Sequence, residues 1–221
     1  MRTLILLSAM VLPWPLKRFV LNRFLGFQIA RSAKIGLSWL GMRHLKMSAG
    51  SRIGHFNLFK NLDLVELGEY SEVCRFNKFT CISSRNADHY QHIAGRVTSF
   101  RMGKQSNLTM GHILDCNCPI KIGNFTTIAG YRSQFLTHSV DLAECRQDAR
   151  PIEIGDFCFI STSSIILGGS VLPNRCVLAA GSVLREAFPD TGCLYAGVPA
   201  KLKKRLPKDT QYWQRKTGWI A

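Results

Sequence analysis

Ile154-Gly-Asp-Phe-Cys-Phe, Ile160-Ser-Thr-Ser-Ser-Ile, Ile166-Leu-Gly-Gly-Ser-Val, Leu172-Pro-Asn-Arg-Cys-Val and Leu178-Ala-Ala-Gly-Ser-Val are successive blocks of six residues, and Leu184 opens the next block. An aliphatic residue opens every block, and a small residue stands fifth in each: Cys158, Ser164, Ser170, Cys176 and Ser182. Average residue usage gives agreement at both positions a chance probability on the order of one in 10^4 to 10^5. The stretch is therefore a six-residue repeat.

The same rule recurs upstream, so the repeat occupies most of the chain. Further blocks open at Leu67, Val73, Phe79, Met102, Leu108, Leu114, Ile122 and Ile128, and Ile35-Gly and Ile53-Gly stand three blocks apart. Three blocks of six predict one coil with three short strands and three corners. Strand side chains alternate, so the opening residue and the residue two places before it point inward. Stacked coils then form parallel sheets, which predicts an all-β parallel β-helix over residues 35-200.

Composition and charge narrow the class of partner. The chain has 221 residues, 46% of them hydrophobic, and a formal net charge of +15. It can bury one large core, and its charge favours an anionic partner such as phospholipid headgroups or a phosphorylated ligand. Nucleic acid fits less well, because the basic residues are not interleaved with aromatic residues in a stacking pattern. Cys158 and Cys176 occupy the small fifth position of their blocks, as serine does in the other blocks. We therefore interpret them as core residues of a reduced, cytosolic protein and predict no metal site.

The N-terminal segment, residues 1-34, is apolar and then amphipathic. Its first apolar run is too short to span a bilayer and ends at Pro13-Trp14-Pro15. The second part places Leu16 and Phe19 against Lys17, Arg18 and Arg23 at helical spacing. Such a helix is suited either to the inner face of an anionic membrane or to packing on the body of the protein. Residues 201-221 form a basic C-terminal tail.

Two segments break the repeat and are expected to project as loops. They are residues 85-96, which are polar, and residues 139-151, which are charged. Loops that project from a rigid scaffold commonly carry binding and catalytic residues.

The repeat, together with Ala179-Ala-Gly-Ser-Val183 and Tyr195-Ala-Gly-Val-Pro-Ala-Lys201, resembles the hexapeptide-repeat acyltransferases. The resemblance covers about residues 35 to 205 and is nearest to the O-acetyltransferases of sugars and surface polysaccharides. It implies a left-handed parallel β-helix, a cytoplasmic homotrimer, acetyl-CoA as the acyl donor, and a sugar or polysaccharide acceptor. Blocks such as Ile166-Leu and Leu172-Pro lack the family's glycine in second place, which leaves the acceptor and subfamily open.

Thr137-His138-Ser139 stands where the family has its catalytic histidine, just before a charged loop. Acyl transfer from a thioester to a hydroxyl needs a base for the hydroxyl proton and an acid for the departing thiol, and one imidazole serves both. Asp141 either orients His138 or begins the loop. Counting sixes from Ile128 turns His138 inward, whereas catalysis needs it outward. We therefore predict an irregular corner in residues 130-134, shortened by one residue.

Further candidates come from the resemblance and from the position of each residue in the coils. The donor is expected along Ala179, Ala180, Gly181, Arg185, Lys201, Lys203, Lys204 and Arg205, whose cations suit the phosphates of coenzyme A. The acceptor is expected near His112, Asp115, Asn117 and Tyr131. The alternative for His112 is a structural role in an inward position of the coil. The alternative for each lysine or arginine is that it belongs to a solvated basic tail and binds no phosphate.

Two other functions remain open from the sequence. A non-catalytic β-helix scaffold or binding protein is compatible with the repeat and the charge. A carbonic anhydrase-like metalloenzyme is less compatible, because zinc needs converging histidines and the coil strands carry no closely spaced pair.

Overall fold

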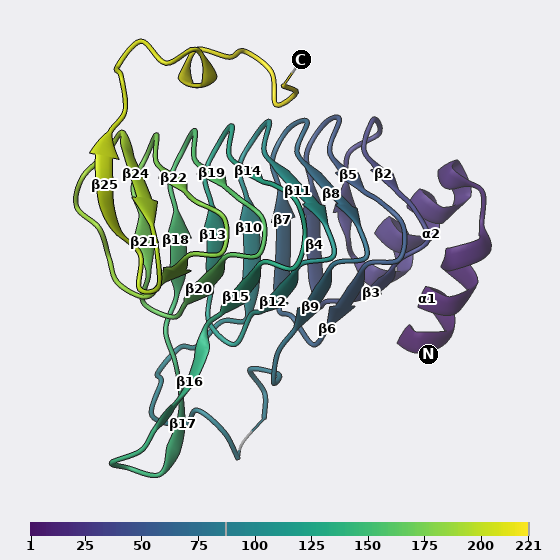
Figure 1. The fold of residues 1–221 in the computed structure, drawn as a ribbon. Helices are drawn as coiled ribbons and strands as arrows, with labels where there is room; N and C mark the ends of the chain where they lie inside the picture. The colour runs from purple at the N-terminus through teal and green to yellow at the C-terminus, as the bar shows by residue number, and fades with distance from the viewer. Residues whose placement is uncertain (87, 221) are drawn as a thin grey trace.

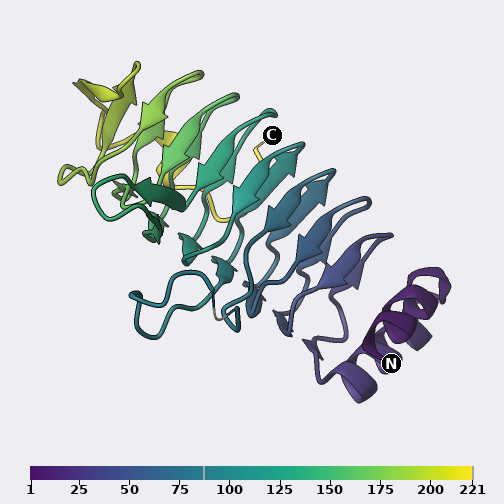
Figure 2. The same cartoon turned by 90° about the horizontal axis from the view of Figure 1, so that it is seen from below.

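The structure is a computed structural model that describes residues 1–86 and 88–220. Three parallel sheets wrap around one core as a triangular prism, with sequential strands passing from sheet to sheet (Figure 1). The predicted parallel β-helix is thereby confirmed. A view along another direction shows the coils stacked in a single row (Figure 2).

The strands of each sheet recur once per coil. The first sheet contains β1 (Gln28–Ile29), β4 (His44–Met47), β7 (Leu64–Leu67), β10 (Ser99–Met102), β13 (Ile120–Ile122), β18 (Ile152–Ile154) and β21 (Val171–Leu172). The second contains β2 (Lys34–Ile35), β5 (Arg52–Ile53), β8 (Glu72–Arg75), β11 (Asn107–Met110), β14 (Thr127–Ile128), β19 (Phe159–Ile160), β22 (Val177–Leu178), β24 (Cys193–Ala196) and an antiparallel β25 (Lys201–Arg205). The third contains β3 (Trp39–Gly41), β6 (Leu58–Lys60), β9 (Lys78–Thr80), β12 (Ile113–Asp115), β15 (Gln134–Leu136), β20 (Ile165–Leu167) and β23 (Val183–Leu184).

The repeat residues fill the interior as the alternation of strand side chains requires. The aliphatic residues that open the blocks from Ile160 to Leu184 are fully buried, and so are the small residues at the fifth positions. Register is continuous between coils, for example from Ile160 to Leu178 and on to Tyr195. Each coil covers the inward side chains of the next, so the core runs the length of the prism.

A ladder of polar side chains runs through one inward position of successive coils. Asn57 Oδ1 accepts from the backbone N–H of Asn77, and Asn77 Oδ1 accepts from that of His112. His112 Nδ1 accepts from the N–H of Ser133, and Ser133 Oγ accepts from that of Ser164. These bonds satisfy backbone groups at a corner where the sheets do not reach.

Two helices close the N-terminal end of the prism. They are α1 (Arg2–Val11) and α2 (Trp14–Leu25), which pack on each other and on the first coil (Figures 1 and 2). Gly26 ends α2 in a left-handed conformation, and the first strand follows two residues later. In the described part of the chain, no helix has the length and apolar character needed to cross a membrane.

Three segments leave the prism. A long loop connects β9 to β10, and β16 (His138–Asp141) pairs with β17 (Arg146–Ala149) in an antiparallel hairpin on the same side (Figure 1). The two excursions touch, because His92 Nε2 lies 3.3 Å from Asp148 Oδ1. After β25 the chain returns along one corner through a short 3-10 helix, Gln211–Trp213, and Gly218 N–H donates to Gln105 Oε1.

Candidate active site

His138 points outward because the corner before it is irregular. The chain takes seven residues, not six, to pass from buried Ile128 to buried Phe135, and Arg132 adopts a φ of 63° within that corner. The irregularity lies where we predicted it, but it lengthens the block instead of shortening it. A change of one residue in either direction reverses which side chains face the core. The His138 side chain is 41% exposed as a result.

Asp115 holds His138 from the preceding coil. It ends β12, whose register with β15 places it opposite Leu136, and its Oδ2 lies 3.2 Å from His138 Nδ1. The other carboxylate oxygen accepts hydrogen bonds from the backbone N–H and the side-chain amide of Asn117. A carboxylate beside Nδ1 favours the tautomer that carries its proton there. Nε2 is then left with the lone pair that a general base needs.

A cavity of about 550 Å³ opens in front of this pair. His138, Asp115 and Asn117 line it from the coils. The projecting segments supply Tyr90 and Gln147 as further walls. An open cavity next to an exposed imidazole has room for a sugar-sized molecule.

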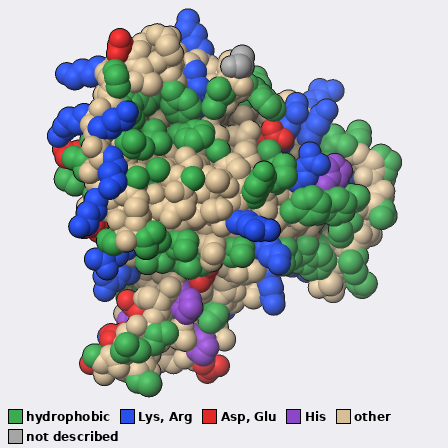
Figure 3. Space-filling model, in the orientation of Figure 1, with side chains coloured by type: hydrophobic (Ala, Val, Ile, Leu, Met, Phe, Trp, Pro, Cys, Tyr) green, Lys and Arg blue, Asp and Glu red, His purple; other side chains and the backbone are tan. Residues whose placement is uncertain are grey.

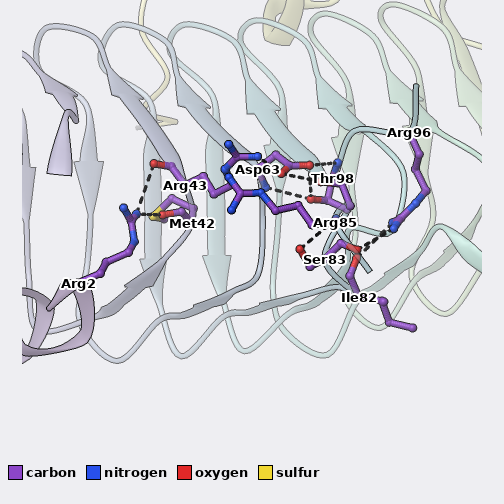
Figure 4. Close-up of polar contacts among 10 residues, drawn as sticks. Arg2, Met42, Arg43, Asp63, Ile82, Ser83, Arg85, Arg96 and Thr98 are labelled. Carbon is purple, nitrogen blue, oxygen red and sulfur yellow. Dashed lines mark hydrogen bonds and ion pairs between the residues drawn. The ribbon is translucent and has the colours of Figure 1, made fainter. Parts of the chain in front are cut away.

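Hydrogen bonds to Asp63 anchor both ends of the long loop. Ser84 Oγ donates to one carboxylate oxygen of Asp63 at 2.8 Å, and Thr98 Oγ1 donates to the other at 2.9 Å. Burial acts to raise the pKa of Asp63, but the hydrogen bonds from Ser84 and Thr98 outweigh it and lower the pKa below the ordinary value. Arg43 stands 3.5 Å from the same carboxylate (Figure 4).

Arg96 ties the loop to the coil that carries Asn117. Its guanidinium donates to the backbone carbonyls of Ile82 and Ser83 (Figure 4) at 2.9 to 3.2 Å. It also donates to the carbonyl of Asn117 at 3.0 Å. The same guanidinium lies over the ring of Tyr90, 4.3 Å from its centroid. Arg96 thereby fixes the wall of the cavity that Tyr90 forms.

Comparison with known proteins points to one kind of fold. No protein-family model matches the chain. A polysialic acid-specific acetyltransferase, NeuO, superimposes with a TM-score of 0.54 at 15% identity over 83% of this chain and 84% of its own. The hexapeptide-repeat-containing acetyltransferase VCA0836 of Vibrio cholerae superimposes with a TM-score of 0.51 and is 19% identical. The match covers 93% of this chain and 89% of VCA0836.

The chain has the fold of the hexapeptide-repeat acetyltransferases. The resemblance found in the sequence is confirmed at this level, and with it the left-handed parallel β-helix.

Curated relatives match a shorter part of the chain. YvoF of Bacillus subtilis 168, whose name describes an inferred acetyltransferase, is 30% identical over 103 residues. These residues are 46% of this chain and 58% of YvoF. WbbJ of Escherichia coli K12, whose name describes an inferred lipopolysaccharide biosynthesis O-acetyl transferase, is 29% identical over 68 residues. These residues are 31% of this chain and 34% of WbbJ. The chain thus spans between a third and somewhat over half of the length of these relatives.

The structure separates several residues that the sequence analysis had assigned to catalysis or to the acceptor. Asp141 lies in the hairpin, where it accepts from the N–H of Ala143 and of Glu144 and pairs with Arg146, so Asp115 occupies the place beside His138. His112 is fully buried in the polar ladder and does not line the cavity. Tyr131 is exposed at the corner between β14 and β15 and is not among the lining residues either.

The residues expected at the donor lie nearer the C-terminal end of the prism. Ala179, Ala180 and Gly181 form the corner between β22 and β23, and Arg185 follows β23. Lys201, Lys203, Lys204 and Arg205 are exposed on β25, where Arg205 pairs with Asp190 at 3.2 Å. In the second sheet, β25 lies four strand spacings beyond β14, the strand of the coil that leads to His138, so about 19 Å separates these cations from His138 along the axis.

Sequence reasoning missed Tyr90, Arg96 and Gln147 as neighbours of the site. All three lie in segments without periodicity, so no repeat position indicated which way they point. Their proximity to His138 depends on how the loop folds back over the coils.

Proposed function

We propose that the protein is an acetyl-CoA-dependent O-acyltransferase that acts on a hydroxyl of a sugar, in a surface polysaccharide or its precursor. The observation that carries the proposal is an outward His138 that contacts Asp115 through Nδ1 and lines an open cavity. The names of the relatives and the acetyltransferases that share the fold support the same reaction class.

In this mechanism His138 acts first as a base and then as an acid. Nε2 takes the proton of the acceptor hydroxyl as its oxygen attacks the thioester carbonyl. The tetrahedral intermediate then expels coenzyme A as a thiolate, and the imidazolium returns the proton to the sulfur. Asp115 stabilises the imidazolium between the two steps because its carboxylate contacts the opposite ring nitrogen.

Transfer is direct, without a covalent enzyme intermediate. Cys81 lines the cavity, but burial raises the pKa of its thiol to about 11. A thiol with that pKa is protonated at neutral pH and is a poor nucleophile. The acyl group therefore passes from the donor thioester to the acceptor in one addition and elimination.

Acetyl-CoA is proposed to lie along the prism, with its thioester near His138 and its phosphates toward the C-terminal coils. The exposed cations of β25, led by Lys201, Lys203 and Lys204, supply the charge that phosphate groups need. The corner at Gly181 leaves open space beside the backbone, which suits the narrow pantetheine arm.

The assembly and location are part of the same proposal. A homotrimer is expected from the resemblance, in the cytoplasm and at the inner face of the cell membrane, where precursors of surface polysaccharides are available. The competing function is a non-catalytic scaffold built on the same prism.

Thermal stabilisation by acetyl-CoA, followed by acetyl transfer to a panel of sugars, tests the activity. We expect a rise in melting temperature and an ester product with at least one sugar. His138→Ala should lower turnover by roughly 10^2-fold or more and leave the fold intact. His44→Ala is the matched control, since His44 is exposed on β4 and does not line the cavity. No stabilisation by any acyl-coenzyme A would favour the scaffold, and near-normal turnover of His138→Ala would refute its role.

A further inference from the structure

Two cations of α2, Lys17 and Arg18, donate hydrogen bonds to the first coil of the prism. Lys17 is only 4% exposed, and its Nζ donates to the carbonyl of Gly36 at 2.7 Å. Arg18 Nε donates to the carbonyl of Ile29 at 2.9 Å. These cations satisfy carbonyls at the open end of the first coil, where no further coil supplies N–H donors.

The outer surface of the helices is apolar in consequence. Leu4 is 70% exposed and Val11 is 82% exposed, and the remaining members of this surface are about half exposed or more: Leu7, Leu16, Phe19 and Phe24. Figure 3 shows hydrophobic side chains gathered at the end of the molecule where α1 and α2 lie. The sequence left open a helix that faces lipid headgroups and a helix that packs on the body of the protein. In the structure Lys17 and Arg18 face the first coil.

This end of the protein is also free of acidic residues. Residues 1–62 contain ten lysines and arginines, and Asp63 is the first acidic residue of the chain. Two thirds of the net charge of +15 therefore belongs to the helices and the first two coils. A second copy docked end to end would bring two such surfaces together, and their repulsion would oppose the contact.

We propose that the surface of Leu4, Leu7, Val11, Leu16, Phe19 and Phe24, here called the end cap, binds an anionic lipid bilayer. The apolar side chains enter the boundary between headgroups and acyl chains, and the surrounding cations meet the anionic headgroups. Arg23 is suited to that boundary, since its guanidinium lies 5.9 Å from the ring centroid of Phe24.

The end cap sets the height of the active site above the bilayer, a consequence that rests on the proposed function. Four coil spacings separate the first coil from the one that carries His138, which is about 20 Å at 4.8 Å per coil. With the prism standing on its helical end, an acceptor anchored in the membrane would have to present its hydroxyl at that distance or more, because α1 and α2 lie between the first coil and the bilayer. A sugar several units from a lipid anchor meets this requirement better than the first unit.

Sedimentation of the full chain with vesicles tests the end cap without any substrate. We expect co-sedimentation with vesicles of phosphatidylcholine containing about a third phosphatidylglycerol, and much less with phosphatidylcholine alone or in high salt. Replacing Leu7, Val11 and Phe19 together by serine should weaken binding at least tenfold. Leu142→Ser is the matched control, because Leu142 is exposed on the hairpin, away from the helices.

Two results would contradict the proposal that the end cap binds an anionic bilayer. The first is wild-type protein that stays in the supernatant with both kinds of vesicle. The second is a triple serine variant that binds as tightly as the wild type while circular dichroism shows it folded. If light scattering instead shows that the triple variant splits a larger assembly and neither protein binds vesicles, the surface is a contact between copies. His138→Ala should bind vesicles like the wild type, so loss of activity and loss of membrane binding are distinguishable.

Discussion

Asp115 Oδ2 lies 3.2 Å from His138 Nδ1, although 23 positions separate the two residues in the chain. The coil brings them together, because β12 and β15 are neighbours in one parallel sheet. Asn117 fixes the carboxylate from the side with its backbone and side-chain N–H groups, and Ile82 N–H in turn donates to Asn117 Oδ1 at 2.8 Å. The orientation of the imidazole thus depends on the long loop as well as on the coils.

Asp115→Asn should lower kcat by roughly 10^2-fold with little change in KM for acetyl-CoA. The neutral amide no longer stabilises the imidazolium that forms when His138 takes the proton. Steady-state kinetics on the variant measure this directly. Asp141→Asn is the matched control and should stay within about twofold of the wild type, since Asp141 contacts only the hairpin among the described residues. If Asp141→Asn were the more damaging change, the assignment of Asp115 would be wrong.

The buried His112 should make the fold sensitive to acid. Burial lowers the pKa of His112 to about 4, compared with about 6.5 in an unfolded chain. The unfolded state therefore takes up the proton first, so stability is full above pH 6.5 and falls as the pH is lowered toward 4. The loss from this residue approaches about 3 kcal/mol at pH 4.

His112→Asn should remove that part of the acid sensitivity. Asparagine already occupies the equivalent ladder positions at Asn57 and Asn77, where its carbonyl accepts the same backbone hydrogen bond. Urea unfolding at pH 7 and pH 4.5 compares the two proteins, and titrating carboxylates affect both alike. An equal loss of stability in the wild type and in His112→Asn would show that His112 does not titrate as its burial predicts.

Tyr90→Phe should raise the melting temperature by about 1 to 4 °C. Tyr90 is 4% exposed, and its hydroxyl has no hydrogen-bond partner among the residues that the structure describes. Removing an unsatisfied buried hydroxyl relieves a cost on the order of 1 kcal/mol and keeps the ring under Arg96. Differential scanning calorimetry measures the shift. A lower melting temperature would mean that the hydroxyl makes a hydrogen bond in solution.

The repeat made the prism and its inward residues predictable, because an alternating strand leaves a six-residue signature that survives in every coil. It also located the irregular corner before His138, since a break in the count is visible in the sequence. Whether the corner is one residue longer or one residue shorter than the repeat was not predictable, because either change turns His138 outward. Asp115 was assigned to the acceptor and not to His138, because contacts between coils depend on register that the corner itself shifts.

The helices illustrate a different limit. Their spacing of apolar and charged residues is compatible with either face turned inward, and propensity does not distinguish the two. The deciding factor is the row of carbonyls at the end of the first coil, which belongs to residues such as Gly36 that follow later in the chain. The same limit applies to Tyr90, whose position depends on the folded loop.

Lys17→Met should destabilise the protein by about 1 to 2 kcal/mol, because it removes the donor that satisfies the carbonyl of Gly36. Methionine keeps most of the volume of the buried side chain, so the loss reports the hydrogen bond more than a cavity. Arg23→Met is the matched control in the last turn of the same helix, where the side chain donates to no described carbonyl. Urea unfolding should show a lower midpoint for Lys17→Met and an unchanged one for Arg23→Met. Equal midpoints would mean that the first coil does not need the lysine to close its end.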